Sequence, residues 1–211
     1  MAYDPRMAAA LSGATIAQLQ YWRGGDHPVL IPEVSAERPI LYSFRDLVAL
    51  RTFVYLRAEL SLQRIRRALR TLKGIGKTEH LSKYRLLAQS RRSIVLVEDT
   101  GERAIELVER PGQYVAVVKL GDVMRSFPLD DIEVPDLAHP RKELAVEPEI
   151  RRGYPTVRGT RIAYDLVAEL VRDGVPPEEI KHYYAGVSAA AARDAASFAS
   201  YVDRAGRRQA A

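Results

Sequence analysis

The spacing of apolar residues changes twice along the chain, and this change constrains the fold more than any other feature. Residues 5–73 carry apolar side chains at the three-to-four-residue spacing of helices. Residues 84–119 instead hold short runs rich in β-branched residues, bounded by turn residues, and residues 164–204 return to the helical spacing. Strands gathered in one block between blocks of helices are typical of an α+β protein. We therefore expect an α+β chain with a central small antiparallel β region.

Charge is divided along the chain in the same way. Residues 1–92 carry 16 basic and 7 acidic side chains, residues 93–150 carry 6 and 13, and residues 151–211 carry 10 and 7. The net charge of +5 therefore conceals a basic head and an acidic middle. A basic N-terminal third is typical of a nucleic-acid binder, although a basic solvated surface would give the same count.

Turn-rich boundaries separate three expected domains in the 211 residues. These are a DNA-binding domain at 1–77, a β-rich acidic region at 78–142 and a C-terminal helical domain at 143–211. Length alone is compatible with two or three small domains of this kind.

The chain contains no cysteine, and this excludes whole classes of chemistry. Disulfide frameworks, thiolate metal sites, iron–sulfur clusters and thiol nucleophiles all require cysteine. No apolar run approaches the roughly 18 residues of a membrane span, and the N-terminus lacks the features of a signal peptide. We therefore expect a cytoplasmic protein without cofactor or metal and without a membrane partner.

The first 77 residues predict four helices and one small hairpin, each marked by capping or breaking residues. Thr15 is expected to cap the second helix, and Ser43 with Asp46 to form a capping pair on the third. The expected helices are Arg6–Leu11, Ile16–Arg23, one from Ser43 to about Arg57, and one from Ser61 to Gly74; the expected hairpin joins Val29–Pro32 to Ile40–Tyr42.

The remaining residues predict two hairpins followed by helices. Strands are expected at Tyr84–Gln89, Ser93–Glu98, Ala104–Val108 and Gln113–Lys119, with a short covering helix at Gly121–Phe127 and a linker at Ala138–Lys142. An extended arm at Ile150–Ile162 then leads to helices at Tyr164–Arg172, from Pro176 onward, and at Ala189–Arg204.

Three N-terminal segments resemble the winged helix-turn-helix of MerR-type proteins. Residues 14–22 (ATIAQLQYW) are similar to their recognition helix, 42–51 (YSFRDLVALR) to the stretch after their wing, and 61–69 (SLQRIRRAL) to their last domain helix. The resemblance spans residues 5–73, with the three segments in the family's order. It implies a MerR-like winged helix-turn-helix that binds double-stranded DNA. A winged fold used for protein contact is the alternative.

Such a domain places the start of its recognition helix at base edges and its flanking residues at phosphates. A glutamine amide can pair bidentately with adenine, which makes Gln18, beside Ala17, the expected base-reading residue. Trp22 is expected in the core. The expected DNA-binding residues are Thr15, Ala17, Gln18, Tyr21, Arg23, Arg38, Tyr42 and Arg45.

The C-terminal third carries a second resemblance. Residues 148–150 (PEI), 153–162 (GYPTVRGTRI) and 174–180 (GVPPEEI), with Tyr183-Tyr184, resemble a small domain family long catalogued as of unknown function. Members of that family are similar to VapB-type antitoxins, which are encoded beside PIN-domain toxins. The resemblance implies a helix-turn-helix-like helical domain and a PIN-domain toxin as partner.

An antitoxin that neutralises a PIN-type ribonuclease must block an acidic, metal-binding active site. An arginine inserted among carboxylates does this through charge-assisted bidentate hydrogen bonds. For each candidate, a purely structural or solvated role is the alternative. The candidates are Arg158, Arg161, Arg204, Arg207 and Arg208.

Enzyme chemistry is not expected. The segment Gly74-Ile75-Gly76-Lys77-Thr78 lacks the first glycine and the preceding strand of a phosphate-binding loop, so we interpret it as a helix C-cap. The four histidines (His27, His80, His139 and His182) show no ligand spacing. A nuclease would need the acidic residues Asp122, Asp130 and Asp131 to bind a cation, and a solvated acidic face explains them more simply.

These expectations combine into one leading function and one alternative. The leading hypothesis is a DNA-binding antitoxin that neutralises a co-encoded PIN-domain (VapC-type) ribonuclease and represses its own operon. A homodimer or a larger toxin–antitoxin hetero-oligomer is expected, because two-fold symmetry matches a palindromic operator. The alternative is a MerR-like, stand-alone transcription regulator that responds to a small ligand.

Overall fold

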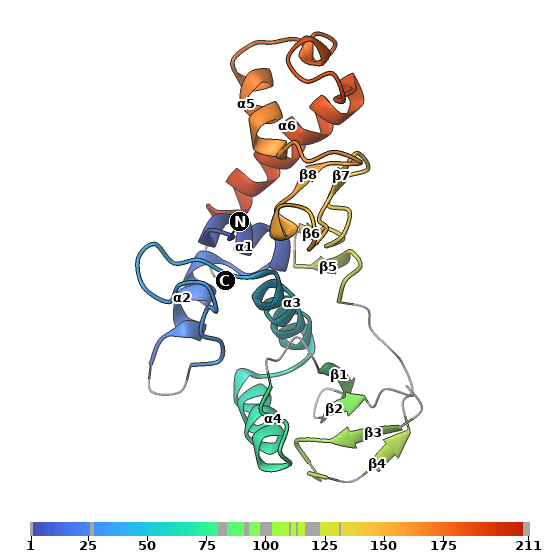
Figure 1. Cartoon of the computed structure of the whole chain (residues 1–211). Helices are drawn as coiled ribbons and strands as arrows, with labels where there is room; N and C mark the ends of the chain where they lie inside the picture. Colours follow the sequence, from blue (N-terminus) through green and yellow to red (C-terminus); the bar gives the residue numbers. More distant parts are fainter. Residues whose placement is uncertain are drawn as a thin grey trace. The chain divides into compact units, whose positions relative to one another are not determined.

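A computed structural model describes the chain except residues 1, 26–27, 80–83, 91–92, 98–102, 110, 113, 117–122, 131 and 209–211 (Figure 1). The chain forms two compact units. Unit 1 contains residues 1–47 and 124–211, and unit 2 contains residues 48–123. These boundaries differ from the three consecutive domains expected, because the two ends of the chain pack together. Helices and small antiparallel sheets occur together, which confirms the α+β class.

The first two helices lie where their caps predict. Helix α1 covers Pro5–Ser12 and helix α2 covers Ile16–Arg23. The Asp4 carboxylate accepts the Met7 amide at 2.8 Å, and Gly13 ends α1 in the left-handed conformation at φ 83°. Local capping chemistry therefore fixes both helices and the short connection between them.

The expected hairpin between Val29–Pro32 and Ile40–Tyr42 is wrong. Leu41 forms an isolated antiparallel bridge with Ser35, and Tyr42 pairs instead with Tyr3. The Val29 and Leu30 amides donate to the Trp22 carbonyl, which folds this segment back onto the end of α2. The chain between α2 and α3 is therefore a loop held by single bridges.

Helix α3 covers Phe44–Glu59 and begins with the expected capping pair. The Ser43 amide donates to the Asp46 carboxylate at 2.7 Å, and the Asp46 amide donates to the Ser43 hydroxyl at 3.0 Å. Asp46 is fully buried and also accepts the Glu33 amide at 3.0 Å. One carboxylate thus holds both the helix start and the preceding loop.

The rest of unit 1 consists of short strands and two helices. Strands β5 (Phe127–Leu129) and β6 (Ile132–Val134) pair antiparallel, as do β7 (Leu144–Ala145) and β8 (Thr156–Val157). The short helix η2 covers Arg151–Gly153 and η3 covers Ile180–His182; the long helices are α5 (Tyr164–Arg172) and α6 (Ala189–Ala205).

Two expected helices are absent from the described parts of their ranges. Of Gly121–Phe127, residues 123–125 form a turn and Phe127 begins β5. After Pro176-Pro177 the chain makes turns and the short 3₁₀ helix η3 rather than an α-helix. A turn of this kind satisfies its backbone with local hydrogen bonds, such as that from the Glu179 amide to the Pro176 carbonyl at 2.9 Å.

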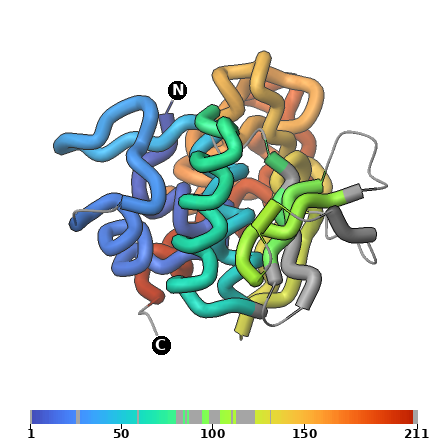
Figure 2. Tube along the Cα trace, turned by 90° about the horizontal axis from the view of Figure 1, so that it is seen from below, coloured from blue at the N-terminus to red at the C-terminus, as the bar shows by residue number. Residues whose placement is uncertain are grey.

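Helix α1 packs against α6, so the first and last helices of the chain share one core (Figures 1 and 2). Every residue from Met7 to Ser12 is buried, and α6 buries mostly alanines. The Tyr201 hydroxyl donates to the Ala10 carbonyl at 3.2 Å, and Arg208 donates to the Gly13 carbonyl at 3.3 Å. Small side chains permit the close approach of the two helices.

A row of aromatic rings extends through the same core. Tyr3 stacks on Tyr154, and the ring centres of Tyr154 and Tyr164 are 5.9 Å apart. The ring of Tyr164 meets that of Phe198 edge-on, with 4.9 Å between their centres, and Phe198 stacks on Tyr201. Burial raises the pKa of Tyr3, Tyr154 and Tyr164. The nearby Asp165 acts in the same direction on the pKa of Tyr154 and Tyr164, and it accepts the Tyr154 hydroxyl at 2.8 Å.

Three consecutive residues of η2 have left-handed backbone: Arg151 (φ 50°), Arg152 (φ 56°) and Gly153 (φ 80°). The Tyr3 hydroxyl donates to the Gly153 carbonyl. A Cβ at position 153 would lie 2.7 Å from the Tyr3 hydroxyl and 3.2 Å from the Phe44 ring. Glycine is therefore required there by both conformation and space.

Unit 2 combines helices with the four-stranded sheet. Helix α4 (Leu62–Gly74) packs on β2 (Ser93–Val97), and Thr71 donates to the Leu107 carbonyl at 2.8 Å. The sheet order is β1-β2-β3-β4, all antiparallel, with β1 at Arg85–Ser90, β3 at Arg103–Glu106 and β4 at Tyr114–Ala116. Both expected hairpins are confirmed at these residues. In the described parts of both units, no helix has the length and apolar character needed to cross a membrane.

We predict that Gly153→Ala lowers the free energy of unfolding by about 2–3 kcal/mol, because the added methyl combines left-handed strain with a clash on Tyr3. Gly159→Ala is the matched control: its φ is 73°, but a Cβ there meets nothing within 4 Å, so only about 1 kcal/mol is expected. Denaturant unfolding measures both variants. Equal losses would contradict the close packing at Gly153.

We also predict that the protein loses stability above about pH 10. Because the folded state raises the pKa of Tyr3, Tyr154 and Tyr164, the unfolded state ionises first and binds fewer protons, so stability falls as pH rises. Each such tyrosine contributes a slope of roughly 1.4 kcal/mol per pH unit above its unfolded pKa. Denaturant unfolding at a series of pH values tests this.

Tyr3→Phe removes one of these ionising groups and should make the alkaline loss shallower. The exposed Tyr183, changed to Phe, serves as the control and should leave the pH dependence unchanged. If the stability of Tyr3→Phe falls with pH as steeply as that of the unchanged protein, Tyr3 does not contribute to the alkaline loss of stability.

Candidate nucleic-acid interface

Helix α2 has one buried face and one exposed face. Leu19 and Trp22 are buried, which confirms Trp22 as a core residue. Ala17, Gln20 and Tyr21 face solvent, and the Tyr21 side chain is 58% exposed. The residues on the exposed face therefore present a small apolar group, an amide and a phenol, all of which can contact base edges or phosphates.

Thr15 and Gln18 are committed to the start of α2. The Thr15 hydroxyl accepts a hydrogen bond from the Gln18 backbone amide at 3.1 Å. The Gln18 side-chain oxygen accepts one from the Thr15 backbone amide at 2.9 Å. This is a complete capping box, and Thr15 is buried. Bidentate pairing with adenine would require the side-chain amide of Gln18 to give up its hydrogen bond to the Thr15 backbone. The Thr-x-x-Gln spacing is a capping-box signal from which this second role of Gln18 could have been predicted.

Tyr42 also has a structural position. It is 1% exposed, and its backbone pairs with Tyr3. Burial raises the pKa of the Tyr42 hydroxyl, and the nearby Arg23 guanidinium acts in the opposite direction. Arg23, in the last turn of α2, is half-buried, so part of its guanidinium reaches solvent.

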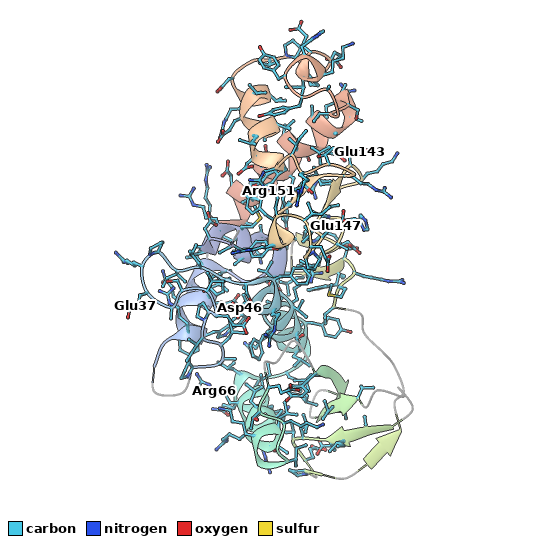
Figure 3. The ribbon with its side chains drawn as sticks, viewed as in Figure 1. Glu37, Asp46, Arg66, Glu143, Glu147 and Arg151 are labelled. Atoms are coloured by element: carbon cyan, nitrogen blue, oxygen red, sulfur yellow. The ribbon has the colours of Figure 1, made fainter. Side chains whose placement is uncertain are left out.

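Of the two other expected arginines, Arg38 lies in the loop between α2 and α3, and Arg45 lies in the first turn of α3. Arg38 is exposed, and it forms no ion pair with any of the described residues. Arg45 pairs with Glu33 at 3.2 Å, and Glu33 also accepts the Ser43 hydroxyl at 2.8 Å. Figure 3 shows Glu37 at the outer edge of this loop and Asp46 on its inner side. A phosphate at Arg45 would have to compete with Glu33.

The expected DNA-binding residues therefore divide into two groups. Thr15, Gln18 and Tyr42 hold the local fold, whereas Ala17, Tyr21, Arg23, Arg38 and Arg45 reach the surface. All belong to unit 1 and lie between the N-cap of α2 and the first turn of α3. Glu33 could not be predicted as the partner of Arg45, because Glu33 lies in the irregular loop and Arg45 lies twelve residues further along, in the first turn of α3.

Arg158 and Arg161 lie in a defined turn between β8 and α5. The Arg158 amide donates to the Glu143 carbonyl at 2.9 Å, and the Thr160 hydroxyl donates to the Val157 carbonyl at 2.9 Å. Both arginine side chains are exposed, and neither forms an ion pair with another described residue. Figure 3 shows Arg151 and Glu143 in the same region, where Arg151 donates to the Arg161 carbonyl at 3.2 Å.

The three C-terminal arginines have different surroundings. Arg204 and Arg207 are exposed. The Arg208 side chain is 21% exposed, bonds to the Gly13 carbonyl and lies 3.9 Å from the Asp130 carboxylate. Arg208 therefore serves the contact between the chain ends, which the sequence did not reveal.

The residues considered for enzyme chemistry do not converge. Asp122, Asp131, His27 and His80 lie outside the described residues. Within the described part of the chain, no three histidine or acidic residues are grouped to hold a metal ion. Gly74–Thr78 is the expected helix C-cap, with the Lys77 amide donating to the Leu72 carbonyl at 2.9 Å.

Comparison with known families finds a match over part of the chain. Residues 145–199 match the family described as a protein of unknown function, DUF433. The matched region contains the 153–162 and 174–180 segments, which confirms the resemblance to a small family of unknown function. The match covers less than half of the chain. A search of curated proteins found no match.

A solved structure shares the fold. The X-ray crystal structure of Rv2018 from Mycobacterium tuberculosis is similar to this chain with a TM-score of 0.53 and 20% sequence identity. The similarity covers 92% of this chain and 96% of that one. At this identity the likeness concerns the fold alone.

Proposed function

We propose that this chain is a DNA-binding antitoxin that represses its own operon and neutralises a co-encoded PIN-domain ribonuclease. The observation that carries the DNA-binding part is the exposed face of α2, together with the arginines at its end, in the next loop and at the start of α3. A capped helix after a tight turn, with Ala17 and Tyr21 outward and Leu19 inward, suits insertion into a major groove.

The cations around α2 supply the phosphate contacts of the proposed complex. Arg38 is exposed and Arg23 is half-buried, so both guanidinium groups can reach the DNA backbone. Arg45 contributes once its ion pair with Glu33 opens. The base-reading role passes from Gln18 to the exposed Ala17, Gln20 and Tyr21, because the cap holds the Gln18 amide.

The toxin-binding part rests on the family resemblance of residues 148–184 and on the two turn arginines. Arg158 and Arg161 extend from a backbone fixed by hydrogen bonds, and neither is paired within the described residues. A guanidinium presented in this way loses little conformational entropy when it inserts among carboxylates. Arg207 is a further exposed candidate, whereas Arg208 is used internally.

A dimer would place two α2 helices on successive half-sites of a palindromic operator. The expected half-site spacing is about one helical turn of DNA or a multiple of it.

The alternative, a regulator that responds to a small ligand, is favoured by one observation. Unit 1 contains a groove of about 740 Å³ lined partly by Arg141 and Arg204.

We predict opposite effects of Arg38→Ala and Glu33→Gln on DNA binding. Arg38→Ala removes a phosphate contact, so affinity for the promoter fragment of its own gene should fall severalfold and the salt dependence should flatten by about one unit of slope. Glu33→Gln frees Arg45 and should raise affinity and steepen the salt dependence. Fluorescence anisotropy at several salt concentrations measures both.

Arg172→Ala is the control, because it removes an exposed arginine of α5, which is not part of the proposed DNA-binding surface. A Gln18→Glu variant keeps the capping box and tests whether the Gln18 amide also reads a base. If Arg38→Ala and Glu33→Gln both bind as the unchanged protein does, α2 and its loop are not the DNA-binding surface.

We predict that the chain forms a complex with the PIN-domain protein encoded beside it and abolishes that protein's ribonuclease activity. The double change Arg158→Ala with Arg161→Ala should weaken inhibition at least tenfold, because it removes the paired charge-assisted bonds. Size-exclusion chromatography and an RNA-cleavage assay measure complex and activity. Arg172→Ala is again the control, and absence of any complex would overturn the antitoxin function.

A further inference from the structure

A groove in unit 1 lies between the last turns of α6 and the segment that contains β6 and the loop after it. Its volume is about 740 Å³, within the range of roughly 300–1,000 Å³ typical of small-molecule sites. Ile132, Pro135, Pro140 and Ala205 supply apolar lining, and the Tyr201 side chain also lines the groove. Its walls thus offer flat apolar surface together with charged groups.

Arg141 is held rigidly at this groove. Its guanidinium lies 5.3 Å from the centre of the Tyr201 ring and 5.6 Å from that of Phe198. Its Nε donates to the Ser197 hydroxyl at 3.4 Å, and Nη1 donates to the Pro140 carbonyl at 2.7 Å. Neither contact uses Nη2, and stacking on two rings fixes the orientation of the fork.

A second arginine, Arg204, stands beside this fixed one. Arg204 is exposed and lines the same groove. Burial lowers the pKa of Arg141, and the charge of Arg204 adds to this lowering. Two guanidinium groups close enough to affect each other attract an anion between them.

The acidic groups around the groove are mostly engaged elsewhere. Asp136 accepts the His139 amide at 2.8 Å and lies 3.9 Å from the His139 ring, and Asp130 pairs with Arg208. Asp194, which favours the charged form of Arg141, accepts the Glu143 amide at 2.8 Å. Glu133 lines the groove and is exposed. Within the described residues, no carboxylate forms an ion pair with Arg141 or Arg204.

We propose that this groove is a binding site for a small organic anion, a carboxylate or phosphate ester with a planar body. The acidic group lies between Arg141 and Arg204, where two guanidinium groups can donate charge-assisted hydrogen bonds. The planar body lies against the prolines and the Tyr201 ring. This site is separate from the α2 surface and from the Arg158–Arg161 turn.

The test is isothermal titration calorimetry on the full chain with four probes: benzoate, phenyl phosphate, inorganic phosphate and benzyl alcohol. The expected result is saturable binding of benzoate, phenyl phosphate or both, with tighter binding than inorganic phosphate or benzyl alcohol. Comparison of benzoate with phenyl phosphate shows which acid the site takes. Failure of both anions to bind at concentrations up to about 10 mM would overturn the proposal.

Variants locate the site. Arg204→Gln should weaken the binding of the preferred anion at least tenfold, and Arg204→Lys should restore part of the loss because it keeps the charge. Arg172→Gln is the matched control: Arg172 is an exposed arginine on α5 that does not line the groove. It should bind as the unchanged protein does. Thermal unfolding should be the same for all three, since these side chains are exposed.

Two results would contradict this assignment. Equal affinity of Arg204→Gln and the unchanged protein would place the anion elsewhere. Benzyl alcohol that binds as tightly as the anions would show that the groove recognises the apolar ring alone.

Discussion

The contact between α1 and α6 is the constraint on which unit 1 depends. Helix α1 is eight residues long and buried from Met7 to Ser12, so it has too little surface of its own to form a core. An isolated helix of this length is unstable in water, and tertiary packing must stabilise it. Helix α6 supplies that packing, together with the hydrogen bonds from Tyr201 to Ala10 and from Arg208 to Gly13. The two ends of the sequence therefore fold as one body.

This closure unites the N-terminal helices with the part of the chain that matches a known family. Helices α1 and α2 and the DUF433-matching region, residues 145–199, all contribute to unit 1. Tyr3 strengthens the link, because it pairs with Tyr42, stacks on Tyr154 and donates to the Gly153 carbonyl. The left-handed turn at 151–153 then positions the segment that leads to Arg158 and Arg161. The proposed DNA surface and the proposed toxin-binding turn consequently share a core.

Local signals predicted the helices well, because caps and breakers act within a few residues. The bounds of α2 follow from Thr15 and Gly24, and those of α5 from the apolar spacing that ends before Gly174. The prediction of a hairpin was wrong because Tyr42 pairs with Tyr3, which lies far away in sequence and carries no pairing signal. The prediction of an α-helix after Pro176 was wrong because a 3₁₀ turn forms hydrogen bonds with the same backbone groups.

The candidate sites were less predictable than the helices for a related reason. Residue type suggested roles for Gln18 and Arg208, but a side chain's role depends on which partner occupies its hydrogen-bonding groups. Gln18 is held by Thr15, a neighbour that the sequence could have indicated. Arg141 is held by Ser197 and Phe198, more than fifty residues away, so no local pattern could identify it.

The arginines of unit 1 show how the fold assigns roles to one residue type. Arg45 and Arg208 face carboxylates, so an incoming anion must displace a partner and its gain in free energy is reduced accordingly. Arg38 and Arg204 are exposed and have no such partner among the described residues, so an anion that binds them displaces no carboxylate. Arg141 differs from both groups. Aromatic rings and neutral hydrogen-bond acceptors hold its guanidinium in place, and neither neutralises its charge. A fixed cation beside a movable one is preorganised for anion binding at low entropic cost, and this distinguishes the groove from the exposed arginines elsewhere on the unit.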